Sequence, residues 1–388
     1  MSINFHLGHG MGGELEKKDW DDLEPSNVKV LQAYYKELNG SIKITWQSPR
    51  PFSSAILLDV DNQSFFIKRS HISFRSVNDL KDEHKIIAAL NMQHISVPDV
   101  LKTLSGETAI QIDDWVYEVH KKSEDLDLYA EQLSWKPFFS TSHARSAGVA
   151  LGQLHNASKH YKNNTPRQTK YLISNQQLLE SPNIIEAIQN KIKRSVGLHQ
   201  YFKDNPLNED VLKQIAYFHS QIRDSLNQQP KIWTHNDFHA SNLLWKKDLT
   251  DTYVGTIIDF GLSNLNCAAY DVATAIERNF IDWLAIYESQ KIQIDWAGIR
   301  TFIQGYCSNI ETLEPLHLVP ELLRVVHLDF ALSELEYFIE ITGNLKHADA
   351  AYCDWFVGHT QWFSQEQGQK FIHDLTLLIK EEVQRYVK

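Results

Sequence analysis

Cysteine is scarce in this chain of 388 residues, which has only Cys267, Cys307 and Cys353, all far apart and without a C-x-x-C pair. This count excludes a disulfide-stapled domain and favours a reducing compartment. No run of 18 apolar residues occurs, so we expect no transmembrane helix and no membrane partner. The N-terminus lacks the charged-then-apolar layout of a signal peptide. Together these absences predict a cytoplasmic protein.

Basic charge is also in short supply. The chain has 38 Lys and Arg against 49 Asp and Glu, a formal net charge of −11. Nucleic acid is therefore not expected as the main partner, because a phosphate backbone requires a basic face. Apolar residues make up 43% of the chain, which allows a large core in two domains or in one large bilobal domain.

The order of the expected elements predicts an α+β fold with two lobes. Residues 1–26 are polar and are expected to form a flexible leader; no strand precedes the glycines of "GHGMGG", so they do not predict a phosphate loop. Residues 41–122 are typical of strand, strand, strand, helix, strand, strand. From about residue 140 the patterns are helical, apart from strand-like segments within 231–259. We therefore expect a small sheet-rich N-terminal lobe over 27–122 and a larger helical lobe over 123–388.

The stretch "HNDFHASNLL" at 235–244 brings candidate catalytic groups together. Asp237 is followed five residues later by Asn242, and then come a strand, a polar turn, a second strand and Asp259 in "DFG". Two strands joined by a turn place their far ends side by side, so Asn242 and Asp259 should be neighbours, with Asp237 on the loop beside them. Carboxylate and amide oxygens suit Mg²⁺, and we expect Asn242 and Asp259 to be its ligands.

A carboxylate beside such a metal can orient an alcohol, or accept its proton, for attack on phosphorus. D-x-x-x-x-N followed by a strand and D-F-G is the order found in kinase catalytic loops, so we assign the catalytic role to Asp237. His235 and His239 are four residues apart, a spacing that could bind zinc on a helix. The H-E-x-x-H mechanism requires Glu at position 236, where this chain has Asn, so His235 is expected to brace the loop, and His239 either to brace it or to face the phosphate.

The segments "THNDFHASNLLW" and "GTIIDFGLSNLNCAAYDVATAI" resemble the H-G-D-x-H-x-x-N, I-D-[FW] and A-Y-D-[LV]-A segments of the aminoglycoside phosphotransferase/choline kinase superfamily. The resemblance extends over roughly 41–290 and is sharpest over 233–274. It implies a bilobal protein-kinase-like fold. It also implies an ATP- and Mg²⁺-dependent kinase whose acceptor is the hydroxyl of a small metabolite or antibiotic, of the aminoglycoside, choline or homoserine type.

The resemblance also implies a nucleotide site in the first lobe. Lys68 in "FFIKR" would meet the phosphates, and Glu83 on the following helix would orient Lys68. Backbone groups near Glu118–His120 would contact adenine. The loop "SPRPFSSA" has no glycine, so Ser53 and Ser54 would donate to phosphate in its place.

Two further positions carry structural expectations. Asn236 stands where the superfamily usually has glycine and would adopt a positive φ. Asp271 in "AYDVA" would hold backbone amides of the catalytic loop.

The acceptor site is not fixed by any motif. Candidate substrate-binding residues follow "AYDVA" or lie on a late helix: Glu277, Arg278, Asn279, His327, Asp329, Glu334, Glu336 and Tyr337, with Trp283, Trp355 and Trp362 as further candidates or core residues. Two other functions stay open. A protein kinase is disfavoured because "GLSNLNCAAYD" is short and no A-P-E follows, and a silent pseudokinase is disfavoured by the intact set of Asp237, Asn242, Asp259 and Lys68.

Overall fold

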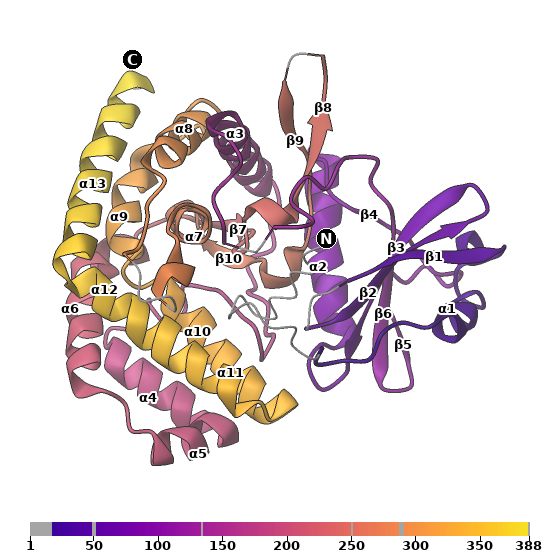
Figure 1. The fold of residues 1–388 in the computed structure, drawn as a ribbon, viewed down its shortest axis with the longest axis horizontal. Coiled ribbons are helices and arrows are strands. Elements are labelled where there is room, and N and C mark those ends of the chain that lie inside the picture. The colour runs from indigo at the N-terminus through magenta and orange to yellow at the C-terminus, as the bar shows by residue number, and fades with distance from the viewer. Residues whose placement is uncertain (1–17, 49–51, 133–134, 250, 287–290, 387–388) are drawn as a thin grey trace.

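An antiparallel sheet forms the N-terminal lobe, drawn in indigo and purple in Figure 1. Its strand order is β1-β2-β3-β6-β4, and β5 also pairs with β6. The sequence-based expectation of three strands, a helix and two strands is met, with the two-residue strand β4 as an addition. The computed structural model describes residues 18–48, 52–132, 135–249, 251–286 and 291–386. The lobe contains α1 (Pro25–Leu31), a 3₁₀ turn η2 (Lys36–Leu38), β1 (Ile42–Gln47), β2 (Ser54–Val60), β3 (Gln63–His71), α2 (Val77–Met92), β4 (Asp99–Val100), β5 (Ile110–Ile112) and β6 (Trp115–Lys121).

Helix α2 is the main helix of this lobe. Ser76 caps it: the Ser76 side chain accepts from the amide of Asp79 at 3.2 Å, and the Asp79 carboxylate accepts from the amide of Ser76 at 2.8 Å. This capping box satisfies two backbone donors at the helix start. Glu83 and His84 are buried on this helix although both are polar. Buried polar groups require partners, so their contacts are functionally informative.

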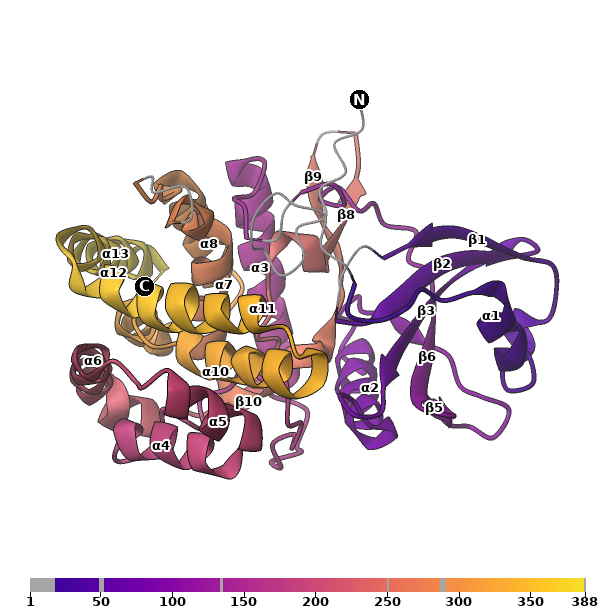
Figure 2. The same cartoon turned by 60° about the horizontal axis from the view of Figure 1, so that its bottom comes forward.

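The C-terminal lobe is mostly helical, as expected (Figure 1, Figure 2). Helices α3 and α8 can approach closely because Gly148 has no side chain. A side chain at this position would collide with the carbonyl of Phe302. The helices are α3 (Thr141–Ser158), α4 (Ile184–Arg194), α5 (Val196–Asp204), α6 (Glu209–Asn227), α7 (Ala268–Phe280), α8 (Trp296–Cys307), α9 (Val319–Leu322), α10 (His327–Tyr337), α11 (Leu345–Ala350), α12 (Thr360–Ser364) and α13 (Glu366–Tyr386), with π-helical segments at Phe338–Thr342 and Ala351–His359 and 3₁₀ turns at Ala240–Asn242, Phe260–Leu262, Trp283–Ile286 and Glu314–Leu318.

Four short strands frame the catalytic loop between the lobes. β8 (Leu243–Lys247) pairs with β9 (Thr252–Ile257) in the predicted hairpin, and β7 (Lys231–Thr234) pairs with β10 (Asn264–Cys267). The β7–β10 pair was not expected from the sequence. The chain segment that leaves β6 is joined to the hairpin, because Leu126 and Trp245 exchange two backbone hydrogen bonds of 2.8 Å.

The residues before α1 bridge the two lobes. Residues 1–17, including "GHGMGG", lie outside the described residues. Trp20 stacks on His71 with ring centroids 4.9 Å apart, and its indole N–H donates to the hydroxyl of Tyr337 at 3.2 Å. The same hydroxyl donates to Asp19 at 3.0 Å. Residues 18–24, expected as part of a flexible leader, are therefore held by specific contacts, because aromatic and polar partners from both lobes converge on them.

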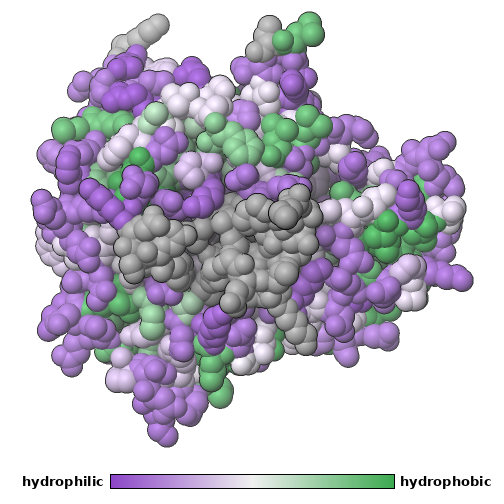
Figure 3. All heavy atoms as spheres, in the orientation of Figure 1, coloured by the Kyte–Doolittle hydropathy of each residue, from purple (hydrophilic) through white to green (hydrophobic). Residues whose placement is uncertain are grey.

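Hydrophilic side chains cover much of the face shown in Figure 3, with smaller hydrophobic patches among them. None of the helices within the described residues combines the length and the apolar character that crossing a bilayer requires.

Candidate active site

The catalytic loop leaves β7 at Thr234 and is fixed by a buried carboxylate. Asp271 accepts from the backbone amides of His235 and Asn236 at 2.7 and 2.8 Å, and from Nε2 of His155 at 3.0 Å. Burial opposes ionisation of Asp271, but the hydrogen bond and charge of His155 outweigh it and lower the pKa of the carboxyl. The prediction that Asp271 holds loop amides is confirmed.

His235 and Asn236 shape the start of the loop. Nε2 of His235 donates to the carbonyl of Ile258 at 3.0 Å, and its Nδ1 accepts from the amide of Asp237 at 3.2 Å. This pattern requires a neutral imidazole, and burial lowers the pKa of His235 accordingly. The ring braces the loop, as predicted. Asn236 has φ of 62°, so the positive φ expected at this position is also confirmed.

Asp237, Asn242 and Asp259 come together where the hairpin begins and ends. The amide of Ile258 donates to the carbonyl of Asn242 at 2.9 Å, which places Asp259 one residue from that contact. Nδ2 of Asn242 donates to the carbonyl and to Oδ2 of Asp237 at 2.8 and 3.1 Å. Because Nδ2 faces Asp237, the amide oxygen of Asn242 remains for another partner. The neighbourhood predicted from the hairpin is confirmed.

Asp259 is the accessible carboxylate of this group. Its side chain is 44% exposed, and its φ of 59° lets Oδ1 accept from the amide of Gly261 at 3.3 Å. Nζ of Lys68 lies 3.5 Å from the same oxygen. Desolvation acts against ionisation of Asp259, but the Lys68 ammonium outweighs it and lowers the pKa of the carboxyl. An ionised, exposed carboxylate beside an amide oxygen fits a hard divalent cation.

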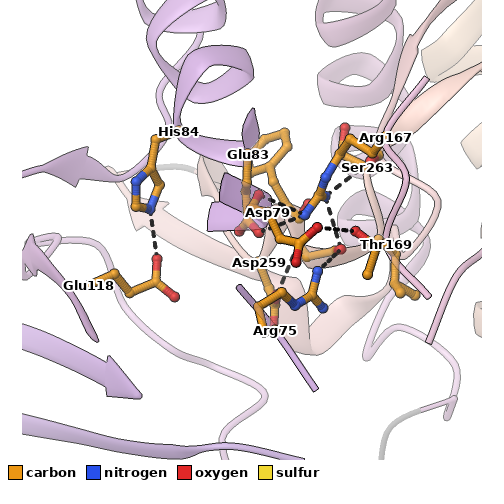
Figure 4. Close-up of polar contacts among 12 residues, drawn as sticks. Arg75, Asp79, Glu83, His84, Glu118, Arg167, Thr169, Asp259 and Ser263 are labelled. Carbon is orange, nitrogen blue, oxygen red and sulfur yellow. Dashed lines mark hydrogen bonds and ion pairs between the residues drawn. The ribbon is translucent and has the colours of Figure 1, made fainter. Parts of the chain in front are cut away.

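Glu83 does not pair with Lys68 in this structure. Instead, its carboxylate lies 3.5 Å from the guanidinium of Arg167 (Figure 4), while Lys68 pairs with Asp259. Arg167 also donates to the carbonyls of Phe260, Gly261 and Ser263 at 3.0–3.1 Å. The predicted orientation of Lys68 by Glu83 is thus corrected, because a guanidinium from a distant loop takes up the Glu83 carboxylate.

The adenine contacts predicted for Glu118–His120 are also corrected. β6 pairs with β3 along one edge and with β4 and β5 along the other, so its backbone groups are used within the sheet. The side chain of Glu118 is buried, and its Oε2 accepts from Nε2 of His84 and of His120, both at 2.9 Å. The side chains and strand pairings of Glu118–His120 therefore give no support to an adenine contact at these residues.

The two serines of the first-hairpin loop have different surroundings. The hydroxyl of Ser54 is buried and donates to the carbonyl of Asp21, so it is not free to meet phosphate as predicted. The reason is the packing of residues 18–24 against the start of β2. Ser53 lies in a bend and is half-buried, which leaves its predicted role open to test. Residues 49–51 of the loop lie outside the described residues.

A small pocket lined by Arg278, the ion-pair partner of Asp237, is the candidate acceptor site. Arg278 lines it and forms an ion pair with Oδ1 of Asp237. Burial lowers the pKa of Arg278 to about 10, so it remains a cation near pH 7.

Glu277 lines the pocket too and faces Nδ1 of His359 at 3.3 Å. Burial raises the pKa of Glu277 to about 8 and lowers that of His359 to about 3, so both are mostly neutral near pH 7. The lining residues are Trp135, Ser174, Thr274, Glu277, Arg278, Val326, His327, Phe330, Trp355 and His359.

Some of the predicted substrate residues line this pocket and others do not. Glu277, Arg278, His327 and Trp355 line it. Those with other contacts are Asn279, which binds the backbone of Phe238 and Ala240; Asp329, which pairs with Lys191; Glu336, which lies 3.8 Å from Lys170; Tyr337, which contacts residues 19–20; and Trp283 and Trp362, which pack against each other.

Sequence reasoning missed part of the pocket wall. Phe330 follows His327 by three residues on α10, and Thr274 precedes Arg278 by four on α7, so helical periodicity was the available signal for both. Trp135 comes from the segment between the lobes, where no periodic pattern exists. The cation–π contacts of Arg278 with Phe330 and Trp135, at 4.8 and 5.9 Å from the ring centroids, could not be read from spacing.

Several solved structures are similar in fold. The aminopropanol kinase associated with a microcompartment is 14% identical, with a TM-score of 0.56 over 88% of this chain and 97% of that one. Amicoumacin kinase, in complex with AMP-PNP, Ca²⁺ and amicoumacin, is 14% identical, with a TM-score of 0.54 over 86% and 93%. Choline kinase from Cryptosporidium parvum is 13% identical, with a TM-score of 0.53 over 91% and 98%. At these identities the likeness shows the fold, a bilobal kinase-like α+β architecture.

No curated protein sequence matches the chain significantly. The model of the phosphotransferase enzyme family (APH) matches residues 51–302, a span that begins at the first hairpin and ends in α8. The span contains Lys68, the whole catalytic loop, Asp259 and Asp271. Because it covers more than half of the chain, the predicted superfamily is confirmed: this protein belongs to the APH phosphotransferase enzyme family.

Proposed function

We propose that this protein transfers the γ-phosphoryl group of ATP to a hydroxyl of a small molecule in a Mg²⁺-dependent reaction. The observation that carries the proposal is the convergence of Asp237, Asn242 and Asp259 at one end of the β8–β9 hairpin, with Lys68 at 3.5 Å from Asp259. The family match and the nucleotide complexes named among the similar structures support it.

Each residue of the site has a chemical role in this proposal. Asn242 and Asp259 would hold Mg²⁺, which neutralises phosphate charge when bound. Lys68 adds a second positive charge near the phosphates. Asp237 orients the acceptor hydroxyl and takes its proton, while the alcohol oxygen bonds to the γ-phosphorus and the bond to the ADP oxygen breaks.

The acceptor would bind where Arg278 meets Asp237; the pocket there is small in this structure, so its lining side chains would have to move apart to admit an acceptor. Aromatic walls and a few convergent polar groups are typical of small-molecule sites. The negative net charge of the chain is compatible with an amino-bearing acceptor. The choice among acceptors would depend on the side chains that line the pocket.

The test is an ADP-release assay with ATP and MgCl₂ over amino alcohols, aminoglycosides, choline, homoserine and sugars, with mass spectrometry of the product. Asp237→Asn is expected to reduce transfer by about 10²- to 10⁴-fold while nucleotide affinity is kept. Asp210→Asn, on the exposed start of α6, is the matched control and should leave the rate unchanged. Wild-type rates in Asp237→Asn would remove the catalytic assignment, and nucleotide binding without transfer to any acceptor would favour a nucleotide-binding module.

A further inference from the structure

Arg75 is a buried cation that has no carboxylate partner within the described residues. It stands immediately before α2 and is 7% exposed, yet no Asp or Glu of the described chain pairs with its guanidinium. The two other cations of this region do have such partners. Lys68 lies 3.5 Å from Asp259, and Arg167 lies 3.5 Å from Glu83. A buried charge without a counterion is costly, so Arg75 is suited to an anion that the chain does not supply.

One end of the Arg75 guanidinium is fixed and the other is not. Nη1 donates to the carbonyl of Gly261 at 3.1 Å, and the guanidinium carbon lies 5.1 Å from the centroid of the Phe74 ring. Because the guanidinium is a rigid planar fork, these two contacts also fix the position of Nη2. Nη2 itself makes no hydrogen bond to any residue that the structure describes.

Gly261 leaves a space between Arg75 and Asp259. A Cβ atom at this glycine would lie 3.1 Å from Oδ1 of Asp259 and 3.7 Å from Nη2 of Arg75. Figure 4 shows the two side chains next to each other. Nζ of Lys68 lies 3.5 Å from the same Oδ1. One carboxylate oxygen and two cationic groups therefore surround a small volume that the glycine leaves unfilled.

The charges around this space favour an anion with several oxygens. Burial opposes the charge on Lys68, and Arg75 acts in the same direction, but the carboxylates, led by Asp259, outweigh both and raise the pKa of Lys68. The two cations are thus close enough to repel each other. Under the proposed function, a divalent ion at Asp259 would add more positive charge there. Phosphate oxygens would offset these charges, and a guanidinium binds them with strong hydrogen bonds.

We propose that Arg75 is a phosphate-binding residue, whose Nη2 donates to a phosphate oxygen of the nucleotide beside Lys68 and Asp259. The inference rests on the proposed nucleotide site and not on any acceptor. Lys68 reaches the phosphates from the sheet, and Arg75 reaches them from the start of α2 while its Nη1 holds Gly261. The alternative is that Arg75 only ties α2 to Gly261. The two roles differ in whether the effect of a substitution depends on the phosphates.

The test compares a nucleotide with a nucleoside in wild type and in Arg75→Gln. Affinity for AMP-PNP with MgCl₂ is measured by calorimetry, and affinity for adenosine by an NMR titration that extends to millimolar concentration. We expect Arg75→Gln to weaken AMP-PNP binding by about 10- to 100-fold, the range for losing a hydrogen bond between charged groups. Adenosine affinity should stay within about twofold of wild type. An unchanged AMP-PNP affinity, or equal losses for both ligands, would overturn the proposal.

Arg69 offers a matched control. It is also buried, lies over an aromatic ring and donates to backbone carbonyls, those of Asp21 and Asp22. It follows Lys68 on β3, so the two side chains point to opposite faces of the sheet. Arg69→Gln should lower the melting temperature and leave AMP-PNP affinity within about twofold of wild type. A loss of affinity as large as that of Arg75→Gln would contradict a specific role of Arg75.

Two further outcomes separate this inference from the proposed function. If Arg75→Gln does not fold, Arg75→Lys keeps the charge but lacks the fork that holds Gly261 and a phosphate together, and it should give a smaller loss of AMP-PNP affinity. Wild-type affinity in Arg75→Lys would contradict the two-armed role. A wild-type protein that does not bind AMP-PNP would overturn the proposed function and this inference with it, whereas wild-type binding that Arg75→Gln retains would overturn this inference alone.

Discussion

The guanidinium of Arg278 on α7 forms an ion pair with Oδ1 of Asp237, while Nδ2 of Asn242 donates to Oδ2 of the same carboxylate. Both oxygens of the proposed catalytic residue are therefore held, one from each side. Arg278 is buried against the rings of Phe330 and Trp135, so its own position is fixed. Catalysis that depends on orientation should be sensitive to this contact.

We predict that Arg278→Gln lowers kcat by about tenfold or more, because Asp237 loses its partner and its fixed orientation. The KM for ATP should stay near the wild-type value, since Arg278 lines the candidate acceptor pocket, whereas Lys68 and Asp259 belong to the proposed nucleotide site. Steady-state kinetics measures both constants. Arg223→Gln, which removes an exposed arginine on α6, is the control. An unchanged kcat in Arg278→Gln would exclude this role.

Asp271→Asn should destabilise the protein by about 3 kcal/mol, the size expected when one member of a buried charged network is removed. The reason is that Asp271 serves two backbone amides and His155 at once, and an amide side chain cannot accept all three hydrogen bonds. Urea unfolding followed by circular dichroism measures the change. The exposed Asp210→Asn control should stay within about 0.5 kcal/mol of wild type. The same small value for Asp271→Asn would contradict the assignment.

Glu277 makes stability depend on pH. Its folded pKa is raised to about 8, above the ordinary value, so between these values the folded protein holds a proton that the unfolded chain has lost. Stability should therefore decrease as pH rises from about 4.5 toward 8, by at most about 1.4 kcal/mol per pH unit, and level off above that range.

Glu277→Gln removes the titratable carboxyl group, so it should flatten the pH dependence of stability between about pH 4.5 and 8. Melting temperatures at pH 5, 6, 7 and 8 measure it, and the variant should gain relative to wild type as pH rises. A wild-type and a variant curve that run parallel would show that Glu277 is ionised in the folded state.

Trp20→Ala should lower the free energy of unfolding by about 2 kcal/mol, because it removes ring contacts with His71 and Trp115 and a hydrogen bond to Tyr337. The matched control is Trp46→Ala on β1, where the side chain is 41% exposed. Differential scanning calorimetry of both variants tests whether residues 18–24 join the lobes. Equal, small effects would mean that they do not.

The sequence predicted those parts of the site that depend on local spacing. Asn242 and Asp259 could be placed together because a hairpin fixes its own ends, and the helical character of the chain after about residue 140 was also expected. The order of strands and helices in the N-terminal lobe followed from periodicity of side chains along each segment.

What the sequence did not predict are contacts between distant segments. Arg167 lies in a loop without periodic pattern, yet it takes the Glu83 carboxylate from 84 positions away along the chain. The β7–β10 pair joins strands of four residues each, too short for a clear alternation. The hydrogen bond from the Ser54 hydroxyl to the carbonyl of Asp21 involves a segment that was expected to belong to a flexible leader. Such contacts depend on how distant segments pack in the folded chain, and the spacing of residues along the sequence does not show that packing.

The two backbone hydrogen bonds between Leu126 and Trp245 connect the catalytic hairpin to the segment that joins the lobes. The chain passes from one lobe to the other just before Leu126, and Trp245 lies three residues after Asn242, the proposed metal ligand. Ile257 at the other end of the hairpin is held by the carbonyl of Ser96, which follows α2. The hairpin is thus fastened at Trp245 to the segment that joins the lobes and at Ile257 to the N-terminal lobe, so a change in the angle between the lobes would act directly on the strands that carry Asn242 and Asp259.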